Sequence, residues 1–202
     1  CSYIGIQHSG NMMSMQQSHR GERKEHGRVV ITGITVFWAA AFIAIACGSA
    51  TAQNLLSKPE SVVWDSAHAR YLVSNWNTGD IVQIDLDGSF TVFSDGVESA
   101  AGMHIVGDSL FVASNFTAQQ GIAIFSLTTG QQIGYFRPSG MQFANSICSD
   151  TSGYLYISDT QTNRIYKVQL STGVSWSLSN SITWPNGLFF DRRNNRLLVA
   201  SN

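Results

Sequence analysis

Leu155-Tyr156-Ile157-Ser158-Asp159 is an apolar run that ends in a serine followed by an acidic residue, and similar runs recur along the chain. The other copies are Tyr71-Leu72-Val73-Ser74-Asn75, Leu110-Phe111-Val112-Ala113-Ser114-Asn115 and Leu197-Leu198-Val199-Ala200-Ser201-Asn202. The matching serines are 40, 44 and 43 residues apart. Repeats of about 40–45 residues with four strands each are typical of β-propeller blades. The repeat therefore predicts an all-β protein with the β-propeller fold.

Each copy is the second of four strand-like segments. In the first unit these segments are Val62–Asp65, Tyr71–Asn75, Ile81–Leu86 and Phe90–Phe93, and Asp87-Gly88 supplies a tight turn between the last two. No stretch after Gln53 shows helical periodicity. The predicted blades cover residues 59–99, 100–143, 144–184 and 185–202, the last one incomplete. We expect a fragment with about three and a half blades of a ring that has about six when complete.

The N-terminal segment has the pattern of an export signal. Four basic residues between Arg20 and Arg28 precede an apolar run from Val29 to Cys47, and Ala50-Thr51-Ala52 follows. This order predicts a secretory signal peptide cleaved after Ala52, so that residues 1–52 are the upstream segment plus signal and residues 53–202 are the partial propeller. A transmembrane anchor and a lipoprotein signal ending at Cys47 are the alternatives. We expect a secreted or periplasmic protein that meets the membrane only through its export signal.

The composition excludes several classes of protein. Hydrophobic residues make up 44% of the chain, charged residues 12%, and the formal net charge is −1. Outside the N-terminal segment there is no basic cluster that would attract a phosphate backbone, so we expect no nucleic-acid partner. Cleavage after Ala52 leaves Cys148 as the only cysteine, which excludes an internal disulfide. Its short apolar strand predicts a small buried side chain and no nucleophile.

Several openings of the predicted blades resemble those of one known family. Tyr154 to Val168 is similar to the repeat unit of NHL-type propellers. Pro59-Glu60-Ser61-Val62-Val63-Trp64-Asp65 resembles the opening of the first blade in the gluconolactonase/regucalcin-like (senescence marker protein, SGL) family of six-bladed propellers. Phe143-Ala144-Asn145 and Trp184-Pro185-Asn186-Gly187-Leu188 resemble later blade openings of that family. The resemblance extends from about Leu55 to Asn202.

The resemblance implies a divalent metal ion, calcium, at the central channel. Its ligands here would be the Glu60 carboxylate and the amide oxygens of Asn145 and Asn186, which are donors that suit a hard cation. Such an ion polarises a lactone or ester carbonyl or activates a water for hydrolysis. The family's catalytic Asp would lie beyond Asn202. Two departures argue against a gluconate-like substrate, because Ser146 follows Asn145 where the family has Asp, and Phe143 stands where it often has Arg.

Other interpretations of these residues stay open. Glu60 is also compatible with a solvated position at the start of a strand, and Asn186-Gly187 with an ordinary turn. The whole chain is also compatible with a non-catalytic NHL-like propeller that binds a small molecule or a protein. Oxygens of Glu60, Asn145 and Asn186 that lie together would favour the metal-dependent hydrolase, and scattered ones would favour the binding protein.

The remaining polar and aromatic residues predict mainly structural roles. The recurrent serines Ser74, Ser114, Ser158 and Ser201 predict capping or inter-blade hydrogen bonds, and nothing resembles a Gly-x-Ser-x-Gly elbow. His68 is expected in an exposed loop, and His104 either faces the channel or packs in the core. We expect the tryptophans of the repeat region to serve in blade packing and not as a ligand cage, with Trp76 at a strand end where a pocket would open.

Overall fold

The computed structural model describes residues 55–115, 120–179 and 182–201, and every regular element within them is a β-strand. These residues belong to the compact unit Gly48–Asn202. The described part of the chain contains no helix long and apolar enough to cross a membrane. The predicted export signal falls outside the described residues. The strands are β1 Pro59–Asp65, β2 Arg70–Asn75, β3 Ile81–Asp85, β4 Phe90–Ser94, β5 Ala100–Val106, β6 Ser109–Ser114, β7 Gly121–Ser126, β8 Gln132–Phe136, β9 Ala144–Ser149, β10 Tyr154–Asp159, β11 Arg164–Gln169, β12 Ser175–Ser179, β13 Pro185–Asp191 and β14 Arg196–Ser201.

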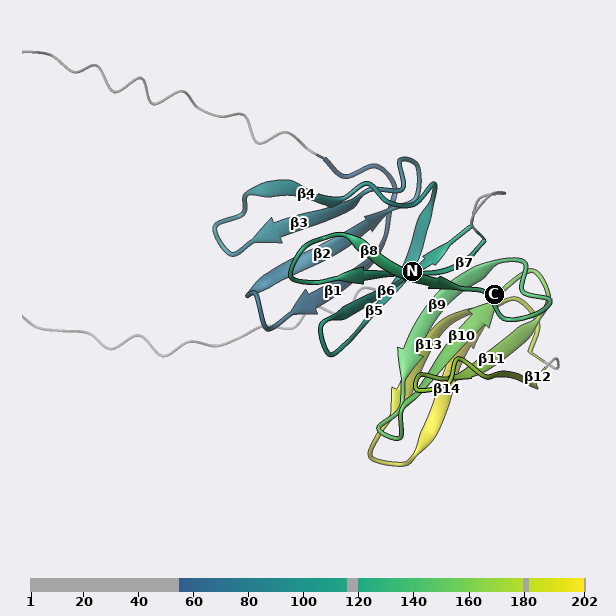
Figure 1. Cartoon of the computed structure of the whole chain (residues 1–202). Helices are drawn as coiled ribbons and strands as arrows, with labels where there is room; N and C mark the ends of the chain where they lie inside the picture. Colours follow the sequence, from purple (N-terminus) through teal and green to yellow (C-terminus); the bar gives the residue numbers. More distant parts are fainter. Residues whose placement is uncertain (1–54, 116–119, 180–181, 202) are drawn as a thin grey trace, which may run out of the picture. The chain divides into compact units, whose positions relative to one another are not determined.

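The strands form consecutive antiparallel meanders (Figure 1). β1 to β4 make the first four-stranded sheet, β5 to β8 the second and β9 to β12 the third, while β13 pairs with β14 in a hairpin. The first strands of successive sheets are neighbours, because β1 packs beside β5, β5 beside β9 and β9 beside β13. Successive four-stranded sheets joined in this way are propeller blades. The predicted fold class is confirmed, and we call the sheets the first, second and third blades and the hairpin the fourth.

The turns between the strands follow the turn residues in the sequence. Gly88 lies between β3 and β4 with φ +83°, and its N–H donates to the Asp85 carbonyl at 2.9 Å. Gly153 lies between β9 and β10 with φ +86°. A side chain at such a positive φ is strained, so glycine is the residue that lets both hairpins close tightly.

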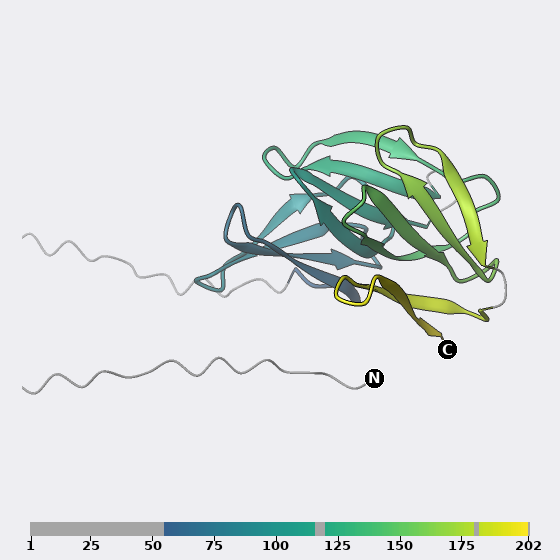
Figure 2. The ribbon, with the colours of Figure 1, turned by 90° about the horizontal axis from the view of Figure 1, so that it is seen from below.

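The core lies between neighbouring blades, which Figure 2 shows side by side in chain order. Along β6, Leu110 and Val112 belong to one buried apolar cluster, which they share with Leu72 of the first blade. Phe111 of the same strand belongs to a second cluster, together with Leu155 of the third blade. Successive side chains of a strand point to opposite faces of its sheet. The central blade is therefore held on both faces, by burial of apolar surface against each neighbour.

Two of the recurrent serines join one blade to the next. The Ser74 hydroxyl donates to the carbonyl of Ala101 at 2.7 Å, and the Ser158 hydroxyl donates to the carbonyl of Asn186 at 2.6 Å. Both hydroxyls also accept a backbone N–H of their own blade, from Ser61 at 3.0 Å and from Ser146 at 2.9 Å. The predicted inter-blade role is confirmed for these two serines.

The junction between the second and third blades is built differently. The Ser114 hydroxyl is buried and has no hydrogen-bond partner among the described residues. At Gly102 the next blade approaches so closely that a Cβ there would lie 2.2 Å from the Asn145 carbonyl oxygen. The Asn115 side chain donates to the Ala144 carbonyl at 2.6 Å and supplies the cross-blade bond in place of the serine.

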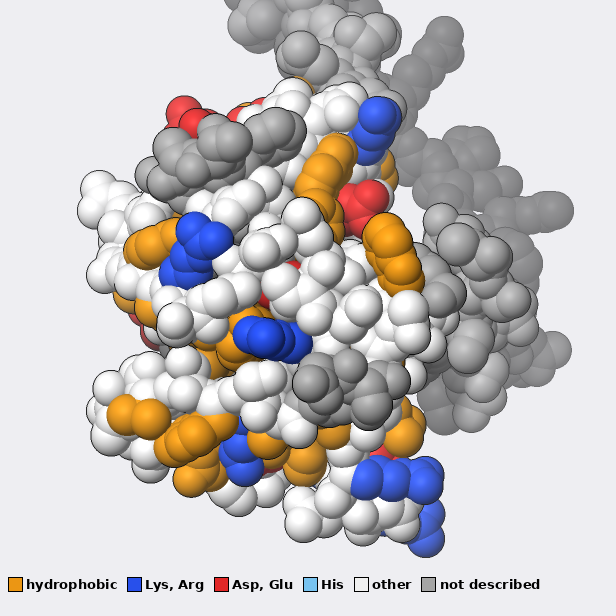
Figure 3. Space-filling view, turned by 90° about the vertical axis from the view of Figure 1, so that its right-hand side faces the viewer, with side chains coloured by type: hydrophobic (Ala, Val, Ile, Leu, Met, Phe, Trp, Pro, Cys, Tyr) orange, Lys and Arg blue, Asp and Glu red, His pale blue; other side chains and the backbone are white. Residues whose placement is uncertain are grey.

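Three of the tryptophans expected in blade packing lie at the surface of their blades and not in the core between them. Trp64, Trp176 and Trp184 are 43%, 45% and 57% exposed. Trp64 stacks on Tyr71 of the adjacent strand with ring centroids 4.7 Å apart, so its contact is across the sheet surface. Hydrophobic side chains reach the surface in several groups on the face drawn in Figure 3, with basic side chains beside them.

Candidate functional site

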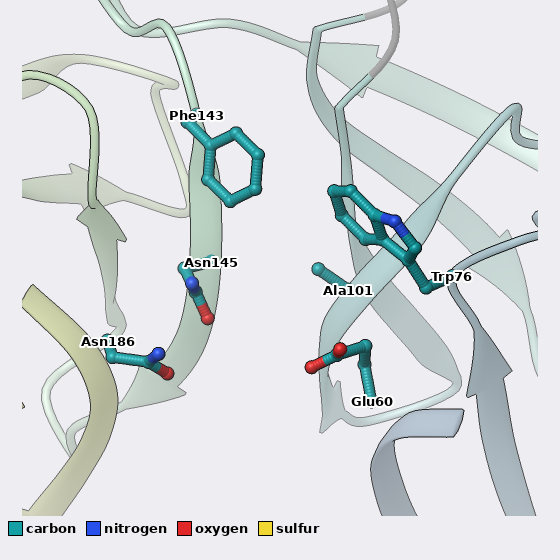
Figure 4. Close-up of a pocket in the computed structure, with 6 residues that line it drawn as sticks. All are labelled: Glu60, Trp76, Ala101, Phe143, Asn145 and Asn186. Atoms are coloured by element: carbon teal, nitrogen blue, oxygen red, sulfur yellow. The ribbon is translucent and has the colours of Figure 1, made fainter. Parts of the chain in front are cut away.

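One cavity is lined by the same strand position in all four blades. Its volume is about 190 Å³, and Glu60, Ala101, Asn145 and Asn186 line it from β1, β5, β9 and β13. Each of these residues is the second residue of the first strand in its blade. Figure 4 shows the side chains of Glu60, Asn145 and Asn186 directed into the space between the strands. The three candidate ligands, which are widely separated in the sequence, therefore lie around a single cavity.

A β-bulge occurs at this position in every blade. The antiparallel register of the first strand shifts between Pro59 and Ser61, between Ala100 and Met103, between Ala144 and Ile147, and between Pro185 and Leu188. A bulge takes a residue out of the ladder of strand pairing and redirects its side chain. The bulge is the local reason why polar residues at the start of a strand face the cavity.

Hydrogen bonds fix the orientation of the Asn145 amide. Its Nδ2 donates to the Thr160 hydroxyl at 3.1 Å, and that hydroxyl donates to the Pro185 carbonyl at 2.7 Å. Because the nitrogen is engaged in this way, Oδ1 is the atom of the amide that faces the cavity, as Figure 4 shows. The adjacent Asn186 is held through its backbone carbonyl by Ser158. Both asparagines are thus positioned by the contact between the third and fourth blades.

Two aromatic rings stand at the other end of the cavity. Trp76 follows β2, Phe143 precedes β9, and their ring centroids are 5.6 Å apart at an interplanar angle of 39°. The buried carboxylate of Asp159 holds the backbone before β9, because it accepts the N–H groups of Gln142 at 2.8 Å and of Phe143 at 3.0 Å. The expectation of a pocket at Trp76 is confirmed, and the cavity has a polar end and an aromatic end.

The donor set fits a hard divalent cation. One carboxylate and two amide oxygens are ligands that calcium accepts, and it fills its remaining positions with water or with oxygens of a bound molecule. Glu60 is the only charged residue among the described residues that line the cavity. Within the described ranges no group of three or more His, Cys, Asp or Glu side chains has metal-binding geometry.

The structure also bears on the alternative interpretations of two candidates. Asn186 lies within β13 and has no positive φ, since the left-handed residue nearby is Trp184 with φ +50°. The turn interpretation of Asn186 is therefore wrong. Glu60 lines the cavity and is also exposed, so it has both the solvated position at the start of a strand and the position at the cavity that was predicted for a ligand.

The histidines lie outside this cavity. His68 is exposed and its Nδ1 lies 2.8 Å from the Asp65 carboxylate, as expected for a loop residue. His104 does not line the cavity of Glu60 and packs with Nε2 2.8 Å from the Ser149 hydroxyl, beside a separate cavity that Arg192 also lines. Burial lowers the pKa of His104, and the positive charge of Arg192 lowers it further. Of the two placements expected for His104, packing is the one observed.

Cys148 is buried, as predicted. Burial, with a smaller contribution from the charge of Asp150, raises the pKa of its thiol to about 12. The reactive form of a cysteine is the thiolate, which is therefore scarce at neutral pH. These properties fit the structural role expected for this residue.

Three features of the site were not predicted from the sequence. They are the β-bulges, the hydrogen bond between Thr160 and the Asn145 amide, and the anchor formed by Asp159, whose carboxylate holds the backbone before β9. A signal for the anchor was present, because each repeat carries Asn or Asp after its serine. In the first blade the equivalent Asn75 accepts the backbone N–H of Ser57 at 2.9 Å. In the first and third blades the repeated position therefore holds the segment that leads into the first strand of the same blade, whereas Asn115 of the second blade bonds to the next blade.

The successive blades, the clusters between them and the shared cavity at their first strands define this chain as part of a β-propeller. Comparison with solved structures supports this class. No family model matches the sequence, and no curated protein matches it at a significant level.

The chain is similar in structure to a streptogramin B lyase, with a TM-score of 0.62 and 12% sequence identity over 72% of this chain and 49% of that one. It is also similar to a catalytically inactive variant of virginiamycin B lyase from Staphylococcus aureus with quinupristin (TM-score 0.59, 18% identity, 74% of this chain and 51% of that one). A third similar structure is an auxiliary nutrient binding protein from Bacteroides thetaiotaomicron (TM-score 0.60, 12% identity, 72% and 36%). The chain thus spans about half or less of the length of these proteins, and identities this low show the fold alone.

Proposed function

We propose that this chain belongs to an exported gluconolactonase-like propeller that binds calcium and hydrolyses a lactone or a related ester. The observation that carries the proposal is the position of Glu60, Asn145 and Asn186 around one cavity. These residues come from three different blades and are the ones that the family resemblance assigns as ligands. Oxygens gathered in this way favour a metal-dependent hydrolase over a binding propeller with scattered polar groups.

Each ligand contributes a defined function. The Glu60 carboxylate supplies the negative charge of the site, and the amide oxygens of Asn145 and Asn186 supply neutral donors that leave positions for water and substrate. Thr160 holds the Asn145 amide so that its oxygen faces the cavity. When bound, a calcium ion would polarise the ester carbonyl and make an attacking water more acidic. The family resemblance assigns the general base to an Asp of a later blade.

Calcium binding tests the proposal directly. Isothermal titration of the complete propeller with calcium chloride is expected to show binding that falls at least about tenfold in Glu60→Gln, because the substitution removes the only carboxylate among the described residues that line the cavity. Glu98→Gln is the matched control, since Glu98 is exposed and does not line the cavity. Equal affinities of Glu60→Gln and the unchanged chain, or no binding to either, would contradict the proposal.

A second function is a non-catalytic propeller that binds a small molecule. The observation that favours it is the aromatic end of the cavity, where Trp76 and Phe143 offer ring surface without any group that takes part in acid–base chemistry. The similar structures include a lyase and a nutrient binding protein, so this fold accommodates both classes. Binding of a ligand that is unaffected by calcium or by Glu60→Gln would favour this second function.

A further inference from the structure

A second cavity lies next to the candidate metal site and shares the Phe143 side chain with it. Its volume is about 490 Å³, and Phe143, Thr160, Gln161 and Trp184 line it. Thr160 also hydrogen-bonds to Asn145 of the smaller cavity. Phe143 and Thr160 therefore connect the lining of the larger cavity to the residues of the candidate metal site.

Polarity differs between the two ends of the smaller cavity. Glu60 and Asn186 lie at one end of the smaller cavity, and the rings of Trp76 and Phe143 stand at the other (Figure 4). Among the described residues that line the two cavities, Glu60 is the only charged one. No arginine or lysine of this lining is available to hold a carboxylate, and aromatic walls bind apolar groups.

Trp184 is presented to the larger cavity by a constrained backbone. It has φ +50°, which a bulky residue rarely adopts, and its N–H donates to Asn163 Oδ1 at 2.8 Å. Lys58 has φ +51° at the equivalent place before Pro59, so this backbone conformation belongs to the repeat. Trp184 is 57% exposed, and an accessible indole that lines the same cavity as Phe143 is suited to cover an apolar group of a ligand.

We propose that the substrate is a lactone that carries an apolar tail, with its ring ester at Glu60, Asn145 and Asn186 and its tail between Phe143 and Trp184. This proposal rests on the proposed hydrolase. In the reaction, water adds to the acyl carbon, the bond from that carbon to the ring oxygen breaks, and the ring oxygen takes a proton, giving an open-chain hydroxy acid. The tail contacts only the aromatic side chains and takes no part in the chemistry.

Three lactones test this preference on the complete, calcium-saturated propeller to which the chain is proposed to belong. Hydrolysis of δ-decalactone, δ-valerolactone and D-glucono-δ-lactone is followed with a pH-stat, and each methylene of the tail that is buried is expected to raise kcat/KM about fourfold. We expect δ-decalactone to be preferred. Phe143→Ala and Trp184→Asn should reduce that preference at least about tenfold. Asn is used at position 184 because it tolerates a positive φ.

Controls of the same chemistry lie elsewhere on the blades. Phe189→Ala and Trp176→Ala remove exposed rings that line neither cavity, and they should leave the preference unchanged. The lactam analogue of δ-decalactone, which binds without rapid hydrolysis, provides a binding readout by isothermal titration. Its affinity should fall in Phe143→Ala and in Trp184→Asn.

The outcomes separate this inference from the proposed hydrolase. Preferred hydrolysis of D-glucono-δ-lactone would overturn the apolar-tail inference while leaving a calcium-dependent lactonase in place. Tight binding of the lactam, lost in both aromatic variants, with no hydrolysis of any lactone would support the apolar site and contradict the hydrolase. Absence of both hydrolysis and lactam binding, or a preference for the tail that survives both aromatic variants, would overturn the inference.

Discussion

Ser158 offers the sharpest test of how the blades are joined, because Ser114 is its counterpart in the repeat. The Ser158 hydroxyl is fully buried, accepts the Ser146 N–H at 2.9 Å and donates to the Asn186 carbonyl at 2.6 Å. Ser158→Ala leaves both of these backbone groups without that partner. A buried polar group left unpaired costs about 1–3 kcal/mol, so for two such groups we expect the free energy of unfolding to fall by about 2–6 kcal/mol.

Ser114→Ala is the matched control. Its hydroxyl is equally buried but makes no hydrogen bond to a described residue. Removing a buried polar group that has no partner is expected to change the free energy of unfolding by less than about 1 kcal/mol, or to increase it. The two variants therefore change the same residue type at the same repeat position, and they differ in hydrogen bonding.

Urea unfolding and thermal unfolding, both followed by circular dichroism, measure the two variants. A loss of 1 kcal/mol lowers Tm by about 2–4 °C in a domain of this size, so Ser158→Ala should melt about 4–24 °C lower than the unchanged chain. Equal losses in Ser114→Ala and Ser158→Ala would refute the reasoning, because burial alone would then explain the effect.

Two further predictions concern the site and the buried thiol. Thr160→Val removes the group that orients the Asn145 amide, and calcium affinity in isothermal titration should fall about three- to tenfold, while Thr91→Val on the exposed side of β4 should change nothing. The pKa of the Cys148 thiol is raised from 9.0 to about 12, so the unfolded chain loses this proton first and the free energy of unfolding should fall as pH rises from 9.0 toward about 12. Cys148→Ala should flatten that fall in urea titrations at several pH values, and an unchanged slope would contradict the assignment.

The repeat in the sequence predicts the fold because each blade repeats the same local pattern. The second strands lie close to their predicted positions, since β10 is Tyr154–Asp159 and β2 is Arg70–Asn75. The first strands begin earlier than predicted, at Pro59 where the apolar pattern begins at Val62, and at Ala100 where it begins at Met103. The bulge interrupts the alternation that marks a strand, so residues at the bulge resemble loop residues in the sequence.

The exposed tryptophans show a second limit of the sequence pattern. Trp176 lies on β12, the outermost strand of its blade, and its ring lies 6.3 Å from that of Tyr154. An outer strand has a neighbour on one side only, so hydrophobicity there does not show whether a ring faces the adjacent blade or the solvent. The contact between the rings of Trp76 and Phe143 could not be predicted from the sequence for a related reason. The two residues are far apart in the sequence, and their contact depends on the packing of different blades.

The bulge also explains why the groups that join the blades are different from the side chains that line the cavity. The junctions use backbone carbonyls and N–H groups around Ser74 and Ser158, and these bonds do not depend on the side chain at the cavity position. That position is Glu60 in the first blade, Ala101 in the second, and asparagine in the third and fourth. Because the backbone there is held by its neighbours, the side chain is free to vary with little effect on the blade. The set of residues at the four bulges, and the aromatic side chains beside them, are therefore where differences in ligand between such proteins are expected to arise.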